Sequence, residues 1–342
     1  MDLFGNHSKK RVIAYSLLGM LFGLVSYMSV GLASNILVYP LLLCLLFVKA
    51  GLIPVLVSIA MFSAVFTALT GIAGTLLAFL VLALPALLTI AAVAGKLPFF
   101  RQLKITIGGF GGSVVALLLI SAAFAGGNLV DAILPAVRQA IESMPASMQD
   151  ALLTVMYPDL IGVNATSIPV LDVLIRKQYL NDLFLVLRED LLDQLLPMLL
   201  RSSLVSAFIA AYFPPRALFV KGRLPQECFV PLSQFALSGQ HTVGILLTTF
   251  AAYLIDVFSG IPSVTTFLTM FTIMECVFAV QGMAAWDRML CAGKAGFGRK
   301  AFSLGAMYVI APTILSAIGI CSALFGRRGL LIRIKKHNDN NN

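Results

Sequence analysis

Charge is scarce in this sequence, because only 11% of its 342 residues are charged whereas 59% are hydrophobic. Soluble globular domains carry about 25% charged residues, so the composition excludes that class. Histidine is also rare, and two of its three copies, His7 and His337, lie in the terminal segments. A histidine-based metal centre is therefore not expected. Five cysteines are too few for a disulfide framework in a chain of this length.

Catalytic motifs are missing as well. The cluster Gly108–Gly112 lacks the Lys-Ser/Thr ending of a phosphate-binding loop, and Ser238 lacks the preceding Gly-x of a nucleophile elbow. Closely spaced acids occur only at Glu189, Asp190 and Asp193, where the pattern predicts a solvated helix face. We therefore predict that the chain is not an enzyme and has no catalytic residue, cofactor or metal. An enzyme acting on lipid is the least supported alternative.

Long apolar runs are what the sequence has in abundance. Crossing the hydrocarbon core of a bilayer takes roughly 20 mainly apolar residues in helix, because no water is present there to satisfy free peptide groups. Nine segments meet or approach this length, and the second is short. They predict an all-α fold, a polytopic transmembrane helical bundle of eight or nine spans in contact with the lipid bilayer. The segments lie near 12–32, 34–49, 51–70, 72–95, 104–126, 197–215, 238–258, 261–286 and 302–325.

The distribution of charge predicts the orientation. Residues 127–197 hold nine acidic against four basic residues, whereas the rest of the chain holds 20 basic against six acidic residues. The basic residues punctuate apolar runs and form no patch of the kind that binds nucleic acid, so no nucleic-acid partner is expected. Because Lys and Arg are retained on the cytoplasmic side of short loops, we predict a cytoplasmic N-terminus and an acidic insert outside. The basic clusters lie at the N-terminus and near 49, 96–104, 216–223, 288–300 and 327–336.

The last two basic clusters do not fit this rule. A single apolar run, 302–325, separates 288–300 from 327–336 and is too short for two full spans. Either one cluster faces outward or a span is miscounted, and the short second segment and the stretch 228–238 are the candidates for a miscount. The stretch 228–238 could be a re-entrant or interfacial piece. An even number of spans would put both termini inside.

Four parts follow from these patterns: an N-terminal membrane bundle at 1–126, an insert at 127–197, a C-terminal membrane bundle at 198–326 and a basic polar tail at 327–342. In the insert, leucines recur at helical spacing and predict amphipathic helices. The insert is either a binding cap over the outer face or a helical hairpin at the level of the lipid headgroups. The leucines are Leu180, Leu183, Leu187 and Leu191.

Small residues four positions apart share single helix faces, where two backbones can approach closely. We interpret them as helix-packing sites within the bundle, with docking of a partner subunit as the alternative use. They are Gly19 and Gly23, Gly108 and Gly112, and the run Ala60, Ala64 and Ala68.

Polar side chains within the spans indicate a candidate site, since an ionisable group in hydrocarbon costs about 2.5–3.5 kcal/mol on insertion scales. Glu275 lies deep in the eighth predicted span, Arg201 enters the sixth and Asp256 closes the seventh. His241 and Gln281 add hydrogen-bonding capacity in the same half of the chain. We predict that these residues line a polar pocket for a small molecule or ion. The alternative is that Arg201 and Asp256 reach an interface and Glu275 is paired structurally.

The C-terminal half resembles a known family in three short segments, Leu195–Pro197 leading into Arg201–Ser203, Arg223–Pro225, and Phe278–Gly282. These resemble the YybS-like family of bacterial multi-pass membrane proteins, a domain of unknown function. The resemblance implies location in the bacterial cytoplasmic membrane and a distant similarity to the substrate-capturing subunits of energy-coupling-factor vitamin transporters. Only Pro225, Gln281 and Gly282 match residue by residue, and the family implies no binding role for them.

Two functions are consistent with these observations. The first is a substrate-binding or transport-type membrane subunit with a site near Glu275 and Gln281, powered by an ATPase on a separate chain, since no phosphate-binding motif is present here. The second is a non-transporting scaffold that anchors cell-envelope or division partners through its small-residue stripes and outer helices.

Overall fold

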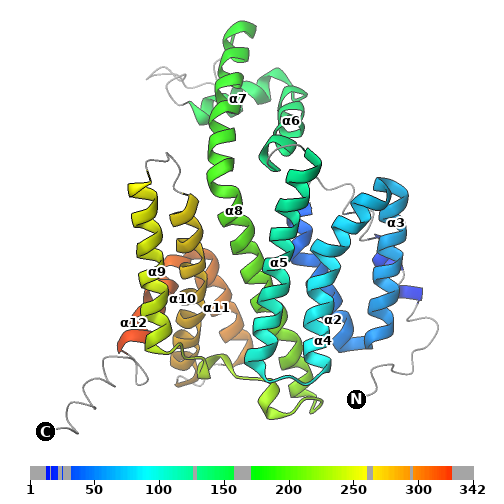
Figure 1. Ribbon diagram of the computed structural model, residues 1–342, viewed down its shortest axis with the longest axis vertical. Coiled ribbons are helices and arrows are strands. Elements are labelled where there is room, and N and C mark those ends of the chain that lie inside the picture. The colour runs from blue at the N-terminus through cyan, green and yellow to red at the C-terminus, as the bar shows by residue number, and fades with distance from the viewer. Residues whose placement is uncertain are drawn as a thin grey trace, which may run out of the picture. The chain divides into compact units, whose positions relative to one another are not determined.

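The computed structural model describes residues 13–15, 17–21, 25, 32–125, 129–157, 171–259, 265–292 and 296–325 (Figure 1). All regular structure in these residues is helical, as the sequence predicts. The chain forms two compact units. The apolar unit comprises residues 1–116 and 197–342, and the insert unit comprises residues 117–196. The membrane segments before and after the insert, expected as separate bundles at 1–126 and 198–326, therefore belong to one unit.

The helices follow one another with short connections. Two helices, α5 and α8, begin in one unit and end in the other. The elements are α2 (Leu32–Ala50), α3 (Leu52–Ala78), the π-helix η1 (Phe79–Ala83), α4 (Leu84–Ala94), α5 (Phe99–Ala125), α6 (Leu129–Glu142), α7 (Ala146–Met156), α8 (Val173–Val220), the 3₁₀ turns η3 (Gln226–Cys228) and η4 (Leu232–Gln234), α9 (Gly239–Phe258), α10 (Thr265–Ala292), α11 (Phe297–Ile310) and α12 (Pro312–Phe325).

Six helical segments of the described residues are long and apolar enough to cross a membrane, or seven if the bent pair α11–α12 counts as one. The chain is therefore a multi-pass membrane protein. The first predicted span, 12–32, lies largely outside the described residues. The second corresponds to α2, in which Tyr39–Ala50 forms an apolar stretch shorter than the six segments. The six segments are Leu52–Ile72, Gly74–Ala94, Phe99–Ile120, the apolar part of α8, Gly239–Phe258 and Thr265–Cys291.

Gly71 makes the turn between the first two of these segments. Its backbone adopts φ 77° and ψ −179°, which is outside the helical region and accessible mainly to glycine. The break divides one long apolar run into two segments of 21 residues each, Leu52–Ile72 and Gly74–Ala94.

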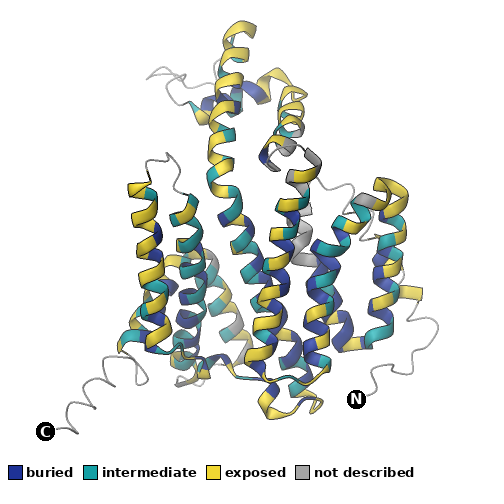
Figure 2. Cartoon of the chain, viewed as in Figure 1, coloured by how far each residue is buried: buried dark blue, intermediate teal, exposed yellow. Residues whose placement is uncertain are grey.

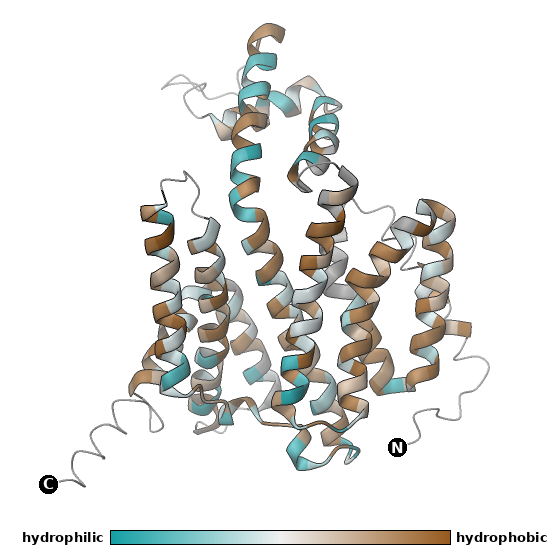
Figure 3. Cartoon of the chain, viewed as in Figure 1, coloured by the Kyte–Doolittle hydropathy of each residue, from teal (hydrophilic) through white to brown (hydrophobic). Residues whose placement is uncertain are grey.

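The outward faces of the long helices are apolar, as lipid contact requires. Helix α9 has only 17% of its most apolar stretch buried within the structure (Figure 2). Its exposed residues include Leu247, Phe250, Leu254 and Phe258. Figure 3 shows the same run of hydrophobic residues along α9, whereas α6 and α7 carry many hydrophilic positions. A water-soluble protein would not leave such a surface uncovered.

The stretch between α8 and α9 is not a span. It contains the 3₁₀ turns η3 and η4 and packs into an aromatic cluster built by residues from α5, α8 and α10. Gln102 at the start of α5 donates a hydrogen bond to the Cys228 carbonyl at 3.4 Å. The start of α5 and the end of α8 therefore lie at the same end of the apolar unit. The buried members of the cluster are Phe99, Tyr212, Phe229, Leu232, Phe235 and Ala284.

Two polar residues of α10 fasten this stretch. The side-chain oxygen of Gln281 accepts a hydrogen bond from the Leu237 amide at 3.0 Å. Arg288 donates to the Ser233 and Phe235 carbonyls at 3.2 and 3.0 Å. The C-terminal part of α10 is thus at the same end as the start of α5 and the end of α8, which gathers their basic residues there. These are Lys96, Arg101, Lys104, Arg216, Lys221, Arg223, Arg288, Arg299 and Lys300.

Helix α11 runs back beside α10 in the opposite sense, at an oblique angle to its axis. Lys300, near its start, lies 3.7 Å from Asp287, and Tyr308, near its end, lies close to Cys276. The chain then turns by 105° at Ala311, between α11 and α12. Each of these two helices has 14 residues, or about 21 Å of helix, which is shorter than the hydrocarbon core of about 30 Å.

Helix α12 runs parallel to α10. Thr313, at its start, donates a hydrogen bond to Glu275 at 3.2 Å, and Ser322, near its end, accepts one from Arg288 at 2.9 Å. Helices α11 and α12 therefore form a sharply bent pair beside α10, called the α11–α12 hairpin below, whose two axes differ in direction by 105°. The open end of the hairpin lies near Asp287 and Arg288, and its tip lies at the level of Glu275.

The insert unit is a small helical assembly with its own core. Helices α6, α7 and the first half of α8 surround the buried residues Leu153, Leu180, Leu183 and Phe184. Leu187 and Leu191 are half-buried, so the leucine pattern does mark the inward face of α8.

A buried ion pair fixes α7 to α8 in this unit. Arg176 contacts both carboxylate oxygens of Asp150, at 2.6 and 2.9 Å, and Asp150 is 3% exposed. The Arg176 hydrogen bonds lower the pKa of Asp150 from its ordinary value, and the same contact raises the pKa of Arg176. More exposed pairs join Arg188 to Asp131 at 2.9 Å and Arg138 to Glu142 at 2.8 Å.

Candidate functional site

Glu275 is a buried acidic side chain near the middle of the membrane-length helix α10. It is 6% exposed. By helical rise it lies about 15 Å from the start of α10 at Thr265 and about 18 Å from Asp287. A carboxylate at that depth requires a partner.

Arg201 on α8 supplies that partner by forming an ion pair with Glu275. The two helices are joined by these side chains, since their backbones are not in close contact over any extended stretch. Arg201 also lies close to Cys276 and Tyr308. Its side chain is 47% exposed, compared with 8% for Glu275, so one member of the pair is enclosed and the other is open.

Thr313 is the third polar group at Glu275. It belongs to the first turn of α12, immediately after Pro312, which lacks an amide hydrogen and suits the first position of a helix. The N-terminal end of a helix carries a partial positive charge of about half a unit. Glu275 therefore receives an arginine, a hydroxyl donor and the positive end of α12 together.

Close packing of α10 against α12 holds this arrangement. A Cβ atom on Gly282 would overlap the Leu315 carbonyl oxygen, and one on Gly319 would overlap the Phe278 carbonyl oxygen. Only glycine permits the two backbones to approach so closely. Gly282 enters the sequence analysis through the family resemblance, but the contact with Gly319 is visible only in the structure.

Asp256 does not join the site. Its carboxylate accepts a hydrogen bond from the Phe267 amide at 2.7 Å, so it caps the N-terminus of α10 from the end of α9. Negative charge is favourable there because the first turn of a helix has free amide hydrogens. The predicted pocket residue is thus a capping residue.

Gln281 and His241 are also placed elsewhere. Gln281 holds the Leu237 amide, as described above. His241 is exposed in the first turn of α9, where its ring nitrogen and its amide both contact the Ser238 hydroxyl. The structure therefore brings together Glu275 and Arg201 of the five predicted site residues, and adds Thr313.

The small-residue stripes differ in their surroundings. A Cβ on Gly19 would lie 2.9 Å from the Ser58 Cα, so Gly19 is a packing position. Gly23 lies outside the described residues. Gly108 and Gly112 have nothing within 4 Å of a built Cβ, whereas their neighbour Gly109 packs against Leu88.

The alanine stripe on α3 also faces outward. Ala60, Ala64 and Ala68 are all exposed. The expected packing within the bundle is therefore absent for these alanines among the described residues, because the buried face of α3 is formed by larger side chains such as Phe62 and Phe66.

Thr313 was not among the predicted site residues, although Pro312 gives a usable signal. A proline within an apolar run predicts a helix break, but it does not predict that the chain returns along α10. No three His, Cys, Asp or Glu side chains converge as a metal site in the part of the chain that the structure describes.

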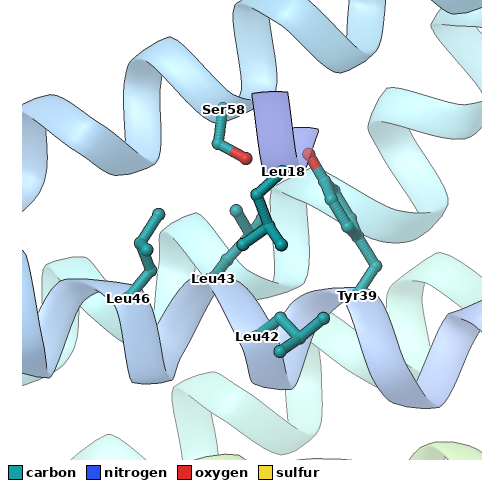
Figure 4. A pocket seen from close by; sticks show the side chains of 6 residues that line it. All are labelled: Leu18, Tyr39, Leu42, Leu43, Leu46 and Ser58. Atoms are coloured by element: carbon teal, nitrogen blue, oxygen red, sulfur yellow. The ribbon is translucent and has the colours of Figure 1, made fainter. Parts of the chain in front are cut away.

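A small cavity near the N-terminal part of the chain is distinct from this site. It has room for about one water molecule, and is too small for a substrate. Figure 4 shows its lining, which is apolar apart from the hydroxyls of Tyr39 and Ser58. The other lining residues are Leu18, Leu42, Leu43 and Leu46.

The comparisons with known proteins add no relative: the chain matches no family model, no curated protein and no solved structure.

Proposed function

We propose that this chain is a transport-type membrane protein, a substrate-binding subunit that captures a small polar molecule at Arg201 and Glu275. One observation carries the proposal: Arg201 is 47% exposed while it pairs with a buried carboxylate midway along α10. A guanidinium facing lipid tails would cost several kcal/mol, on the order of 2.5–3.5 on insertion scales. The exposed side of Arg201 is better explained by a polar cavity that admits water and a ligand.

The hairpin α11–α12 supports a site at this level. Transporters commonly bind substrate near the membrane midplane, where helices are interrupted. Here the interruption at Ala311 lies next to Thr313, which contacts Glu275.

The proposed orientation has the basic end of the apolar unit in the cytoplasm of a bacterial cell, across its inner membrane. The rule that basic loops stay inside supports it. Six spans among the described residues and a re-entrant α11–α12 hairpin would then put the start of α3 and the end of α12 inside and the insert unit outside. This topology also removes the conflict between the basic clusters 288–300 and 327–336, because a hairpin that enters and leaves by the same face keeps both on one side. Assignment to the YybS-like family remains part of the proposal, as does an ATPase subunit on a separate chain.

Binding by purified protein in mild detergent tests the function. We expect at least one class of small polar metabolite, among amino acids, carboxylic acids, sugars, nucleosides and vitamins, to raise the thermal unfolding midpoint of the wild type. The Glu275→Gln and Arg201→Gln variants should lose that response, because each removes one charge of the pair.

Matched controls separate a binding effect from a general effect of charge removal. Glu227→Gln and Arg223→Gln remove one exposed acid and one exposed base from the loop between α8 and α9, and both should respond as the wild type does. The function is wrong if no metabolite class stabilises the wild type, or if both site variants keep the full response.

A second candidate function is supported by the outward position of Ala60, Ala64 and Ala68. Small residues on an exposed helix face permit close approach of another helix, as a membrane scaffold for envelope or division partners would require. Ala64→Leu should then abolish co-purification of a partner while leaving ligand-induced stabilisation unchanged. A scaffold is contradicted if Ala64→Leu leaves the set of co-purified membrane proteins as it is in the wild type.

A further inference from the structure

The charge around Arg201 indicates which class of ligand the site takes. A guanidinium has five N–H donors in a rigid plane. Glu275 occupies one terminal nitrogen, Nη2. No second acidic side chain pairs with Arg201 among residues 32–125, 129–157, 171–259, 265–292 and 296–325. Arg201 also makes a side-chain hydrogen bond with Cys276, and with five donors on a side chain that is 47% exposed it keeps donors for a ligand.

Glu275 is not available to the ligand in the same way. Its side chain is 8% exposed, and Thr313 and Arg201 already contact its two carboxylate oxygens. An incoming cation would have to displace one of these partners before it reached the carboxylate. An incoming anion meets Arg201 directly and requires no such rearrangement.

Charge balance limits the anion further. Arg201 and Glu275 cancel each other, and the start of α12 adds about half a positive charge. A single negative charge on the ligand is therefore accommodated, whereas a dianion would place a second negative charge next to Glu275 with nothing to neutralise it. A planar carboxylate also matches the geometry of the guanidinium donors.

We infer that the ligand is a small monocarboxylate whose carboxyl group binds the open face of Arg201 while Glu275 keeps its place on the other side. This inference rests on the proposed function and names the substrate class of the same site.

Thr269 supports a polar occupant on this face of α10. Its hydroxyl is buried and has no hydrogen-bond partner in the part of the chain that the structure describes. Buried hydroxyls are rarely left unsatisfied. Thr269 shares a helix face with Cys276 two turns away, about 10 Å along the axis towards the start of α10. A water or ligand group between Arg201 and the start of α10 would satisfy it.

A matched series of probes tests the class. Acetate, hexanoate and benzoate are each paired with the amide of the same carbon skeleton, and benzylamine serves as the cationic probe. Thermal unfolding of the full-length wild type is followed at neutral pH as each probe is titrated. We expect at least one carboxylate to raise the midpoint in a saturable manner, and its amide and benzylamine to leave it unchanged.

Arg201 variants connect the response to the site. Losing a charge-assisted hydrogen bond should weaken the apparent affinity for the carboxylate about tenfold or more in Arg201→Gln. Arg201→Lys keeps the charge that Glu275 requires but loses the planar donor pair. This variant should therefore fold, and its affinity for the carboxylate should be at least several-fold lower than that of the wild type. Arg223→Gln, in an exposed loop position, should bind as the wild type does.

Each contrary result has a distinct meaning. Three results would overturn the monocarboxylate inference. A carboxylate and its amide could stabilise the protein equally, Arg201→Lys could bind the carboxylate with unchanged affinity, or no carboxylate could produce a response. If benzylamine stabilises the wild type and Glu275→Gln removes that effect, the inference falls while the proposed binding function stands. If no probe or metabolite binds at all, both fall.

Discussion

Asp150 shows how a single buried side chain can be tested in this protein. Arg176 holds it with two hydrogen bonds, and the pair joins α7 to α8 within the insert unit. Asp150→Asn removes the charge and leaves Arg176 without its counter-ion, so we expect a loss of about 2 kcal/mol in the local stability of α7. Hydrogen exchange of the α7 amides measures this loss. Glu142→Gln, which breaks the exposed pair with Arg138, should have a much smaller effect.

The pH dependence of the same contact has a definite sign. The pKa of Asp150 is lower in the folded state than in the unfolded chain, so its contribution is complete above the unfolded value of about 4 and is lost as the pH falls through the folded value. The difference in α7 protection between wild type and Asp150→Asn should shrink towards zero over that acidic range. A difference that stays constant down to about pH 3 would contradict the assignment.

Asp256 gives a second prediction for a single residue. Its carboxylate accepts from the Phe267 amide in the first turn of α10, and removal of such a cap typically costs about 1 kcal/mol. Asp256→Ala should therefore lower the thermal midpoint of the purified protein, whereas Asp256→Asn, which keeps an acceptor oxygen, should recover most of the loss. If both variants match the wild type, Asp256 does not act as a cap.

For single residues, the sequence predicts which polar side chains lie within the spans better than it predicts which residues they contact. Glu275 stands out because it interrupts an apolar run, whereas Arg201 is the fifth residue of the predicted span 197–215 and was expected near its outer end. Gln281 follows Glu275 on the same helix, but six positions turn a helix through about 240° beyond one full revolution, so the two side chains face different neighbours. Asp256 and His241 lie at helix ends, where local capping uses them. Which helices adjoin Glu275 depends on tertiary packing, and that is not encoded in any local pattern.

The contact between helices α10 and α12 depends on two glycines. Gly282→Ala or Gly319→Ala would place a methyl group against a backbone carbonyl that cannot move independently of its helix. Overpacking of this kind costs about 1–3 kcal/mol or more, and here it would also draw Thr313 away from Glu275. We expect either variant to lower the thermal midpoint by several degrees and to weaken any ligand response that depends on Arg201.

Gly112→Ala is the matched control for this pair. Gly112 is a helical glycine with open space around its Cβ position, so alanine there should leave stability unchanged or raise it by about 0.5–1 kcal/mol. The close contact of α10 with α12 is contradicted if Gly319→Ala behaves like Gly112→Ala.

Element prediction from the sequence works where a helix is long and bounded, and fails where a run contains an internal break. Helices α9 and α10 are found within a few residues of the expected spans 238–258 and 261–286. The run 302–325 was expected as one span, but the structure divides it at Ala311 into α11 and α12. Hydropathy alone cannot distinguish these cases, because both arms of the hairpin are as apolar as a spanning helix. The direction of α12 follows from its contacts with Glu275 and Arg288, which join residues far apart in the chain.

For the whole molecule, the distribution of charge is the strongest constraint on topology. The connections between α4 and α5, between α8 and α9 and between α10 and α11 all carry basic residues, and they share one end of the apolar unit. Along the chain, successive membrane-length segments run alternately away from this basic end and back towards it. This regularity predicts that the end of α12 returns to the same end of the apolar unit. The sequence alone predicts a single span over 302–325, which would place that end on the opposite side.

Two native cysteines permit a direct test of this topology. Cys291, near the end of α10, and Cys321, near the end of α12, are both exposed, whereas Cys44, Cys228 and Cys276 are buried. A re-entrant hairpin places Cys291 and Cys321 on the same side of the membrane. A single span through α11 and α12 places them on opposite sides. Variants that keep one of the two cysteines and replace the other with serine would report each position separately in whole cells.

We expect a membrane-impermeant maleimide to label neither cysteine until the cells are permeabilised, since both lie at the basic end that the charge rule keeps inside. Cysteine introduced at the exposed position Asp172, in the insert unit, should react in intact cells. Labelling of Cys321 but not Cys291 from outside would show that α11 and α12 cross the membrane together. Labelling of both cysteines from outside, with residue 172 protected, would invert the whole molecule and move the open face of Arg201 to the cytoplasmic half of the bilayer.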